Sequence, residues 1–192
     1  MKPHLAPNDT NMFYKYLDKA SYYFEFGSGG STYQASKRSN IKTIYSIESD
    51  KKWYNYLTKS INHNNFNYIF SDIDNAPPLN WGWPGPKATN EQKINYSNHI
   101  VNLNKDIANK IDFIFIDGRF RVACCLKCFD VISSECFIAF DDFLNRPYYH
   151  IVLQYFDIID KTQDNRMVIL KKKYNISAIP QDIIKKYELI HE

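Results

Sequence analysis

Glycine is scarce in this sequence: there are six in 192 residues, and three of them lie between positions 27 and 30. Long apolar runs are absent, since the opening MKPHLAPNDTN has no apolar core of signal-peptide length and no later stretch could span a bilayer. A strong excess of one charge is lacking too, because 24 basic and 21 acidic residues leave a net charge of only +3. That balance is too weak to indicate nucleic-acid binding. We therefore expect a cytoplasmic protein with neither a membrane nor a nucleic-acid partner.

Cysteine is also infrequent, and its four copies lie close together at positions 124, 125, 128 and 136. The motif CCLKC could indicate a metal site, but neither a second C-x-x-C pair nor a nearby histidine accompanies it. Three of the four fall on an apparent helix, where cysteine behaves as a small apolar residue. We interpret all four as reduced core residues rather than as zinc ligands or disulfide partners.

The remaining composition, 44% hydrophobic and 23% charged, is typical of a globular chain, and the length predicts a single domain over residues 1–192. Short apolar runs alternate with helical patterns, and several runs are apolar nearly throughout, as strands covered on both faces are. These runs are residues 21–26, 42–47, 66–71, 111–117, 136–141, 155–160 and 166–171. The alternation predicts an α/β fold with a parallel sheet, in which the last two runs form an antiparallel hairpin at one edge.

Three helices are predicted between the runs: residues 32–39, residues 49–61 with Ser49 or Asp50 as the cap, and residues 121–132. One long connection, residues 73–109, holds four of the eight prolines and two of the three tryptophans. A connection of this length in a compact domain is usually functional or has its own structure. We expect it to be an insertion on the substrate side, and residues 174–192 to form a C-terminal extension.

The clustered glycines lie in EFGSGGST, residues 25–32, where an apolar run ends and a helical pattern begins. Bare backbone at such a turn lets a ligand approach closely. The P-loop pattern fails because no lysine follows, and the dinucleotide fingerprint fails because Thr32 stands in place of its third glycine. Glu25 would also repel a pyrophosphate. A cationic ligand without phosphate, such as S-adenosylmethionine, suits this loop better.

Acids also follow the next two runs. Glu48 ends the second run, 21 residues after Gly27, and could accept hydrogen bonds from ribose hydroxyls. Asp72 follows the third run and could accept from an adenine amino group. Because parallel strands end at the same edge of a sheet, we expect these acids and the glycine loop to face one ligand.

The motif EFGSGG, followed by IES, SD and IDG, resembles the class I S-adenosylmethionine-dependent methyltransferase family over about residues 21–173. The resemblance implies a Rossmann-like, mostly parallel seven-stranded sheet with helices on both faces and a reversed last hairpin. It also implies S-adenosylmethionine as the cofactor, with its methionine end on the glycines, its ribose on Glu48 and its adenine at Asp72. The full implied cofactor set is Glu25, Gly27, Ser28, Gly29, Thr32, Glu48, Asp72 and Asp117. The alternative is a glycine-rich turn of another α/β domain.

Carboxylates also end the fourth and fifth runs, as Asp117 and the pair Asp141 and Asp142. Carboxylates that converge from two adjacent strand ends can hold Mg²⁺, which would lower the pKa of a bound acceptor hydroxyl. This arrangement is similar to that of metal-dependent catechol and sugar O-methyltransferases. The alternative is that Asp142 caps a helix and Asp141 merely ends a strand.

The predicted catalytic set is Asp117, Asp142, Arg119 and His150. His150 could act as a general base, although a lone histidine is more often a packing residue. Arg119 and Arg121 flank Phe120, and if a helix begins here only one of them can face the pocket. An arginine there would bind a substrate carboxylate or phosphate, or else pair with a neighbouring acid.

The connection 73–109 offers Trp81 and Trp83, whose rings could pack on a sugar or could simply cover the core. Together with DGRFRVACCLKCF and DDFLNRPYYHIV, the segment DIDNAPPLNWGWP resembles an uncharacterised methyltransferase-like group associated with surface polysaccharides. Within it, NAPP (residues 75–78) differs from the [ND]PP[YF] signature of nucleic-acid amino-methyltransferases, because Ala76 is inserted and the closing aromatic residue is missing.

We predict an S-adenosylmethionine-dependent O-methyltransferase that acts on a small polar acceptor, foremost a sugar or glycan-precursor hydroxyl. Two alternatives stay open: a metal-independent N- or O-methyltransferase of small molecules, and a catalytically inactive S-adenosylmethionine-binding module. The presence together of Glu25, Glu48, Asp117 and Asp142 favours an enzyme, since a binding relic needs no such set. The sequence leaves open the acceptor, the metal requirement and the oligomeric state, a homodimer included.

Overall fold

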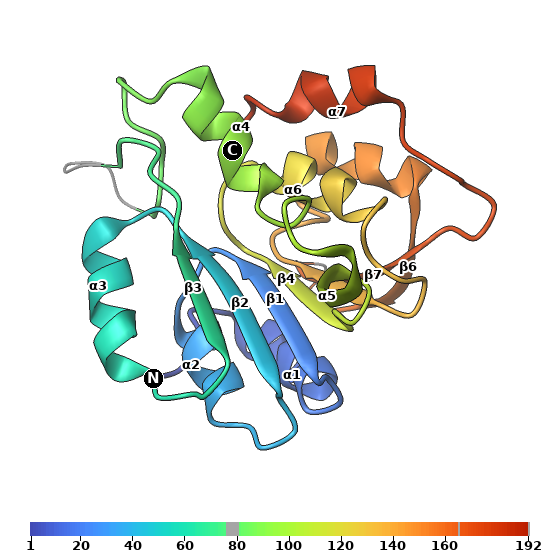
Figure 1. The fold of residues 1–192 in the computed structure, drawn as a ribbon. Coiled ribbons are helices and arrows are strands. Elements are labelled where there is room, and N and C mark those ends of the chain that lie inside the picture. The colour runs from blue at the N-terminus through green and yellow to red at the C-terminus, as the bar shows by residue number, and fades with distance from the viewer. Residues whose placement is uncertain (76–80, 165, 192) are drawn as a thin grey trace.

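A computed structural model describes residues 1–75, 81–164 and 166–191 and is built on a seven-stranded sheet (Figure 1). The spatial order of the strands is β3-β2-β1-β4-β5-β7-β6. Their bounds are Tyr22–Phe26 (β1), Thr43–Glu48 (β2), Phe66–Phe70 (β3), Phe113–Ile116 (β4), Phe137–Phe140 (β5), Phe156–Lys161 (β6) and Val168–Lys172 (β7). Strands β1 to β5 pair in parallel, whereas β7 is antiparallel to both β5 and β6. The predicted sheet with its reversed last hairpin is confirmed.

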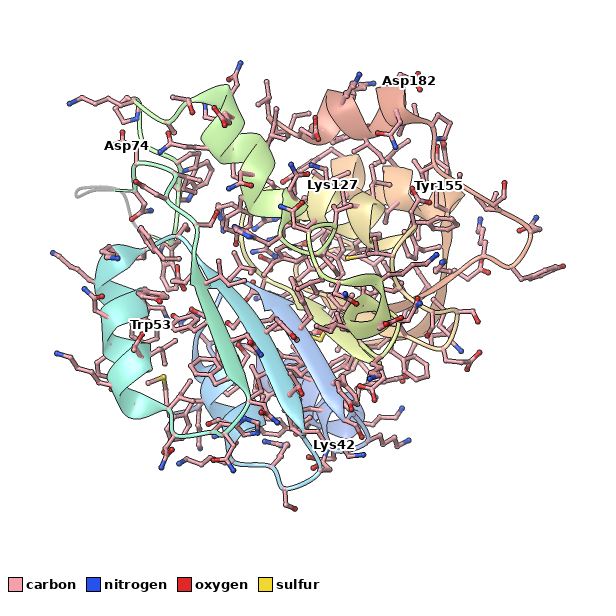
Figure 2. All side chains as sticks on the ribbon, in the orientation of Figure 1. Lys42, Trp53, Asp74, Lys127, Tyr155 and Asp182 are labelled. Carbon is pink, nitrogen blue, oxygen red and sulfur yellow. The ribbon has the colours of Figure 1, made fainter. Side chains whose placement is uncertain are left out.

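Helices cover both faces of this sheet, as predicted (Figure 1). Helices α1 (Pro7–Leu17) and α2 (Gly30–Ser36) pack on one face, against side chains such as Tyr23 and Phe115. Helices α4 (Asn90–Asn98) and α6 (Arg121–Cys128), with the 3₁₀ helix η1 (Pro147–Gln154), cover the other face, which carries Phe24 and Phe26, and α7 (Gln181–Tyr187) packs on α6. Side chains fill the space between the sheet and these helices (Figure 2).

Helices α2, α3 (Lys51–Ser60) and α6 lie where three helices were predicted, and Asp50 rather than Ser49 caps α3, by accepting from the Trp53 backbone N–H. The long connection contains α4, which begins with a capping box between Thr89 and Gln92, and the short α5 (Lys105–Ala108). The residues after β7 include α7, which packs on α6. Helices α1, α4, α5, α7 and η1 were not anticipated.

The four cysteines are free and buried, with Cys124, Cys125 and Cys128 on α6, which confirms their interpretation as core residues. Burial raises the pKa of the Cys125 and Cys136 thiols, so both are protonated at neutral pH. Within the described part of the chain, no helix combines the length and the apolarity needed to cross a membrane.

The strand order reverses beside β1, because the chain builds β1, β2 and β3 in one direction and then places β4 on the other side of β1. In open parallel sheets, the crevice at such a reversal is the usual ligand site, at the carboxyl ends of the strands. The loops after β1 and β4 therefore define the place in which to look for a functional site.

Candidate functional site

A cavity of about 790 Å³ opens at the carboxyl ends of β1, β2, β4 and β5. Its volume is within the range of small-molecule and cofactor pockets. Its lining includes the glycine loop (residues 27–31), the turn after β2 (residues 48–50), the turn after β4 (residues 117–119) and Asp141 and Asp142 after β5. Residues 1–4 and 81–83 also line it, from outside the strand ends. The predicted site residues Gly27, Ser28, Gly29, Glu48, Asp117, Arg119, Asp141 and Asp142 all line this cavity.

The glycine loop is shaped by two different requirements. Gly27 has φ +90°, and a Cβ there would lie 2.6 Å from the Gly118 backbone, so the loops after β1 and β4 pack backbone against backbone. At Gly29 the backbone is extended, and a Cβ would meet only the Trp53 indole nitrogen at 3.9 Å. Gly27 is therefore required by the fold, whereas Gly29 leaves open space that a ligand can use.

Glu25 and Thr32 do not line the cavity, which corrects their predicted contact with a ligand. Side chains alternate along a strand, so Glu25 points to the α2 face while Phe24 and Phe26 point to the opposite face. There the Glu25 carboxylate accepts hydrogen bonds from Thr32 and from three further hydroxyls, those of Tyr23, Ser31 and Ser46. Thr32 in turn accepts from the Gly29 backbone N–H at 2.9 Å. These contacts hold the glycine loop from beneath.

Glu48 faces the cavity from the end of β2, as predicted. One carboxylate oxygen accepts from the backbone N–H groups of Ser49 and Asp50, both at 2.7 Å, and the other accepts from the Ser28 hydroxyl. The Ser28 hydroxyl also lies 2.7 Å from the Tyr68 hydroxyl. Burial raises the pKa of Glu48 to about 7, despite these donors. Glu48 is thus a fixed acceptor to which ligand hydroxyls can donate in place of Ser28.

Two other predicted residues lie away from the cavity lining. Asp72 is exposed, and its carboxylate accepts from the Asp74 backbone N–H at 2.9 Å. His150 lies on η1 with its ring 5.2 Å from that of Phe143, so the structure supports packing rather than general-base catalysis for it. Of the segment NAPP, residues 76–78 lie outside the described residues.

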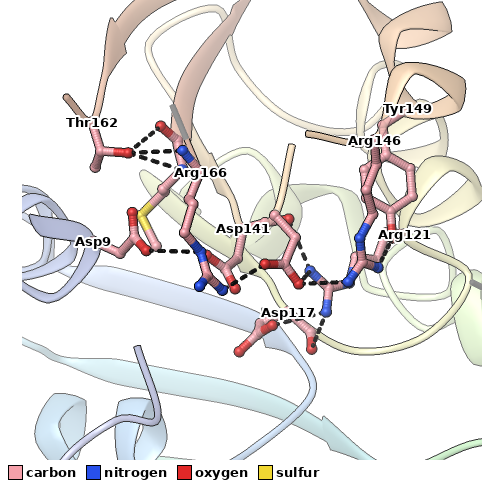
Figure 3. A network of polar contacts seen from close by, with 10 residues as sticks. Asp9, Asp117, Arg121, Asp141, Arg146, Tyr149, Thr162 and Arg166 are labelled. Carbon is pink, nitrogen blue, oxygen red and sulfur yellow. Dashed lines mark hydrogen bonds and ion pairs between the residues drawn. The ribbon is translucent and has the colours of Figure 1, made fainter. Parts of the chain in front are cut away.

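Arginines surround the predicted metal ligands (Figure 3). Asp142 forms ion pairs with Arg166 at 2.7 Å, Arg146 at 2.9 Å and Arg121 at 3.5 Å, and Asp117 pairs with Arg121 at 3.0 Å. Asp142 reaches these partners from a left-handed backbone conformation with φ +56°. Guanidinium groups therefore occupy the positions from which a cation would neutralise these carboxylates.

The predicted Mg²⁺ site is accordingly not supported. Across residues 1–75, 81–164 and 166–191, no three His, Cys, Asp or Glu side chains are arranged to hold a metal ion. Mg²⁺ requires oxygen ligands that are free to surround it. Asp142 instead has its two carboxylate oxygens in ion pairs with arginines.

Asp117 and Asp141 form a carboxyl pair next to this network. Burial and the proximity of Asp117 raise the pKa of Asp141 to about 8, so Asp141 holds a proton at neutral pH. Burial also raises the pKa of Asp117, and the charge of Arg121 is the main influence that opposes this rise. Because Asp117 forms an ion pair with Arg121 at 3.0 Å, it is the member of the pair that gives up its proton more readily, and its side chain is 30% exposed at the cavity.

Both arginines after β4 line the cavity, although only one was expected to do so. Phe120 has φ +53°, so α6 begins after it, at Arg121, and Arg119 lies outside the helix. Arg121 bridges the acids described above. The Arg119 guanidinium lies over the Trp83 ring at 5.1 Å instead, which places one of the two predicted tryptophans beside it.

Sequence reasoning missed the contribution of residues 1–4, which we call the N-terminal segment. Gln34 of α2 donates to the Met1 carbonyl at 2.6 Å, and the His4 ring lies 5.1 Å from that of Trp81. A Cβ at Gly30 would overlap the Lys2 carbonyl, so this glycine allows the segment to cross the loop. The missed signal was Gly30 itself, the one glycine of the cluster to which no role had been given.

No protein-family model and no curated protein matches the sequence. A methyltransferase-like protein from Silicibacter pomeroyi has a similar structure, with a TM-score of 0.82 and 22% identity over 98% of this chain and 97% of that chain. A candidate caffeoyl-CoA O-methyltransferase from Staphylococcus aureus has a TM-score of 0.51, with 14% identity over 90% of this chain and 86% of that chain. A candidate RNA methyltransferase from Pyrococcus horikoshii also has 0.51, with 12% identity over 88% and 83%. At these identities the likeness establishes the fold alone: the chain has the α/β fold of these methyltransferases.

Proposed function

We propose that this protein binds S-adenosylmethionine and transfers its methyl group to a hydroxyl of a small polar acceptor, with sugar hydroxyls as the first class to test. One observation carries the proposal: a single cavity at the strand-order reversal is lined by both the open glycine loop and the buried acceptor Glu48. Glu48 suits ribose hydroxyls, and the loop offers space at Gly29. The fold shared with methyltransferases is consistent with this ligand.

The residues beyond the glycine loop could assist methyl transfer without a metal ion. Bound S-adenosylmethionine would supply an electrophilic methyl group, whose bond to sulfur breaks as a bond to the acceptor oxygen forms. Asp117, kept ionised by Arg121 and by the proton on Asp141, would take the proton that the acceptor hydroxyl loses. Arg121, Arg146 and Arg166 would hold Asp142 in place of a metal.

Calorimetry with S-adenosylhomocysteine, the reaction product, tests the ligand. Gly29→Ala is the sharpest variant, because the free protein has room for the added methyl group while a ligand on the loop does not. We expect wild-type protein to bind and Gly29→Ala to bind about tenfold more weakly or worse, which corresponds to ~1.4 kcal/mol. Ser60→Ala, which removes an exposed hydroxyl on α3, serves as the control.

The melting temperature of Gly29→Ala should stay close to that of the wild type, which separates lost binding from lost folding. NADH should not bind, because the dinucleotide fingerprint that accommodates a pyrophosphate needs a third glycine and Thr32 takes that position. Absence of S-adenosylhomocysteine binding in the wild type, or equal affinity in Gly29→Ala, would refute the proposed site. Production of S-adenosylhomocysteine with a panel of sugars then tests the acceptor class.

A further inference from the structure

Arg119 differs from the other arginines that line the cavity, because none of the acids that the structure describes is paired with it. Arg121, Arg146 and Arg166 each form an ion pair with Asp142. Among the described residues, Arg119 forms no ion pair within 4 Å, and its guanidinium donates no hydrogen bond. Its charge is therefore available to a ligand in the cavity.

The position of Arg119 makes this lack of a partner unusual. Its side chain is buried, with 8% of the residue exposed, and its Nε is a buried donor without an acceptor. Burial and the neighbouring charge of Arg121 lower its pKa. A buried donor or charge without a partner is unfavourable, and native proteins rarely leave one unsatisfied. Such a group at the wall of a cavity indicates that a bound molecule supplies the missing acceptor.

The surroundings of the guanidinium indicate how it would bind. The Trp83 ring lies over it at 5.1 Å, and the backbone N–H of Arg119 donates to the Tyr96 hydroxyl at 3.4 Å. An aromatic ring on one side of the guanidinium restricts its movement and leaves its other N–H groups for a ligand. A planar fork of this kind matches a carboxylate or phosphate, with two parallel hydrogen bonds.

We propose that Arg119 binds an anionic group, a carboxylate or a phosphate, of the methyl acceptor. This inference rests on the proposed function and narrows its acceptor class to anionic hydroxy compounds. Arg119 follows Asp117 by two residues, so one acceptor can place its anion on Arg119 and a hydroxyl near Asp117. We assign the anion to the acceptor rather than to the amino-acid end of the cofactor, because Arg119 lies beneath Trp83 of the 73–109 connection.

Inorganic phosphate is the probe for this subsite. We expect phosphate at constant ionic strength to raise the melting temperature of the wild type, both alone and with saturating S-adenosylhomocysteine. Arg119→Met, which keeps a long apolar side chain, should weaken phosphate binding about tenfold or more. Arg119→Lys should bind with intermediate affinity, because lysine keeps the charge but loses the fork. Arg38→Ala, which removes an arginine outside the cavity that is paired with Asp18, is the matched control and should bind phosphate like the wild type.

Calorimetry with S-adenosylhomocysteine distinguishes the acceptor from the cofactor as the source of the anion. Arg119→Met should keep the wild-type affinity for S-adenosylhomocysteine within about threefold. If it weakens S-adenosylhomocysteine tenfold but leaves 5′-methylthioadenosine, which lacks the carboxylate, unaffected, then Arg119 holds the cofactor and the assignment is overturned. If the wild type does not bind S-adenosylhomocysteine, the proposed function is refuted. Phosphate binding can still be measured in that case, and it tests the anion subsite at Arg119 separately.

Thermal denaturation without ligand excludes a purely structural role. Removing a buried and unpaired charge should leave the melting temperature of Arg119→Met equal to or above that of the wild type, even as phosphate binding is lost. A fall of several degrees would show that Arg119 stabilises the fold, and equal phosphate binding in wild type and Arg119→Met would show that the anion lies elsewhere. Either result overturns the proposal.

Discussion

At the scale of single residues, two buried glutamates show that the direction in which a side chain points decides whether it can reach a ligand. Glu25 and Glu48 both lie near the carboxyl ends of adjacent strands, and burial raises the pKa of each to about 7. Glu25 points beneath the glycine loop and is surrounded by hydroxyl donors, whereas Glu48 faces the cavity. The first therefore holds the loop in shape, and the second is available to a ligand.

The ionisation of Glu48 predicts how ligand binding depends on pH. Ribose hydroxyls donate most strongly to the ionised carboxylate, so binding favours the form that prevails above pH 7. We expect the affinity for S-adenosylhomocysteine to rise between pH 6 and pH 8 in calorimetry. Glu48→Gln should bind about tenfold more weakly at pH 8 and lose this dependence. Asp106→Asn, on the exposed start of α5, is the control. A wild-type affinity that decreases as the pH rises from 6 to 8 would contradict the role of Glu48.

The sequence placed most of these residues but could not orient them. Spacing put Glu48, Asp117, Asp141 and Asp142 at strand ends, and all four line the cavity. Which face Glu25 takes depends on the pleat and on the hydroxyls brought to it by α2 and β2. The pairing of Asp142 with Arg121 and Arg166 depends on contacts between segments that are far apart in sequence, which spacing alone does not reveal.

At the scale of elements, the strands were predictable and several helices were not. The strand segments of β1 and β4 are almost wholly apolar and were found within a few residues. Helix α4 is polar along much of its length and buries few residues, so its sequence carries little helical periodicity. Helices α1 and α7 lie outside the alternating strand–helix pattern on which the prediction depended.

The N-terminal segment gives an element-scale prediction about ligand release. It crosses the start of α2 and contacts Trp81, so it forms part of the cavity wall. Gly30→Ala should displace it, because the added Cβ would overlap the Lys2 carbonyl. Alanine favours a helix over glycine by about 1 kcal/mol, so α2 itself should not be weakened.

We expect Gly30→Ala to remain folded and to release S-adenosylhomocysteine several-fold faster than the wild type in stopped-flow experiments. Ser36→Ala is the matched control, since it removes a hydroxyl on the same helix whose one hydrogen bond within the described part of the chain goes to the Tyr33 carbonyl. Unchanged release from Gly30→Ala would mean that the N-terminal segment does not retain the ligand.

At the scale of the whole molecule, the strand order brings together residues that are far apart in sequence. The reversal beside β1 places the loops after β1 and β4 in backbone contact through Gly27 and Gly118, and Asp141 follows on the next strand. The parallel sheet was predictable from alternation, and with it the edge that carries the site. Because several acids are buried at this edge, their pKa values are raised, and several of them hold protons at neutral pH.

These protonated carboxyls predict that stability falls as pH rises. The pKa values of Glu25 and Glu48 are raised by burial to about 7 and that of Asp141 to about 8. In the unfolded chain such groups lose their protons near pH 4, so between about pH 4 and pH 8 the folded state binds more protons. The free energy of unfolding should therefore decrease across this window, by ~1.4 kcal/mol per pKa unit for each group at most, and level off above it. His99, whose pKa is lowered by burial, opposes this trend, but the carboxyls with raised pKa values outnumber it.

Thermal denaturation without ligand should accordingly give a lower melting temperature at pH 8.5 than at pH 5.5. Glu25→Gln should reduce that difference, because Glu25 is fully buried and its replacement no longer titrates. Glu135→Gln, at an exposed carboxylate paired with Lys171, should leave the difference unchanged and serves as the control. A melting temperature that instead rises through this window would mean that ionised carboxylates stabilise the sheet edge. Asp141 would then be ionised at neutral pH. It would not supply the proton that keeps Asp117 as the base.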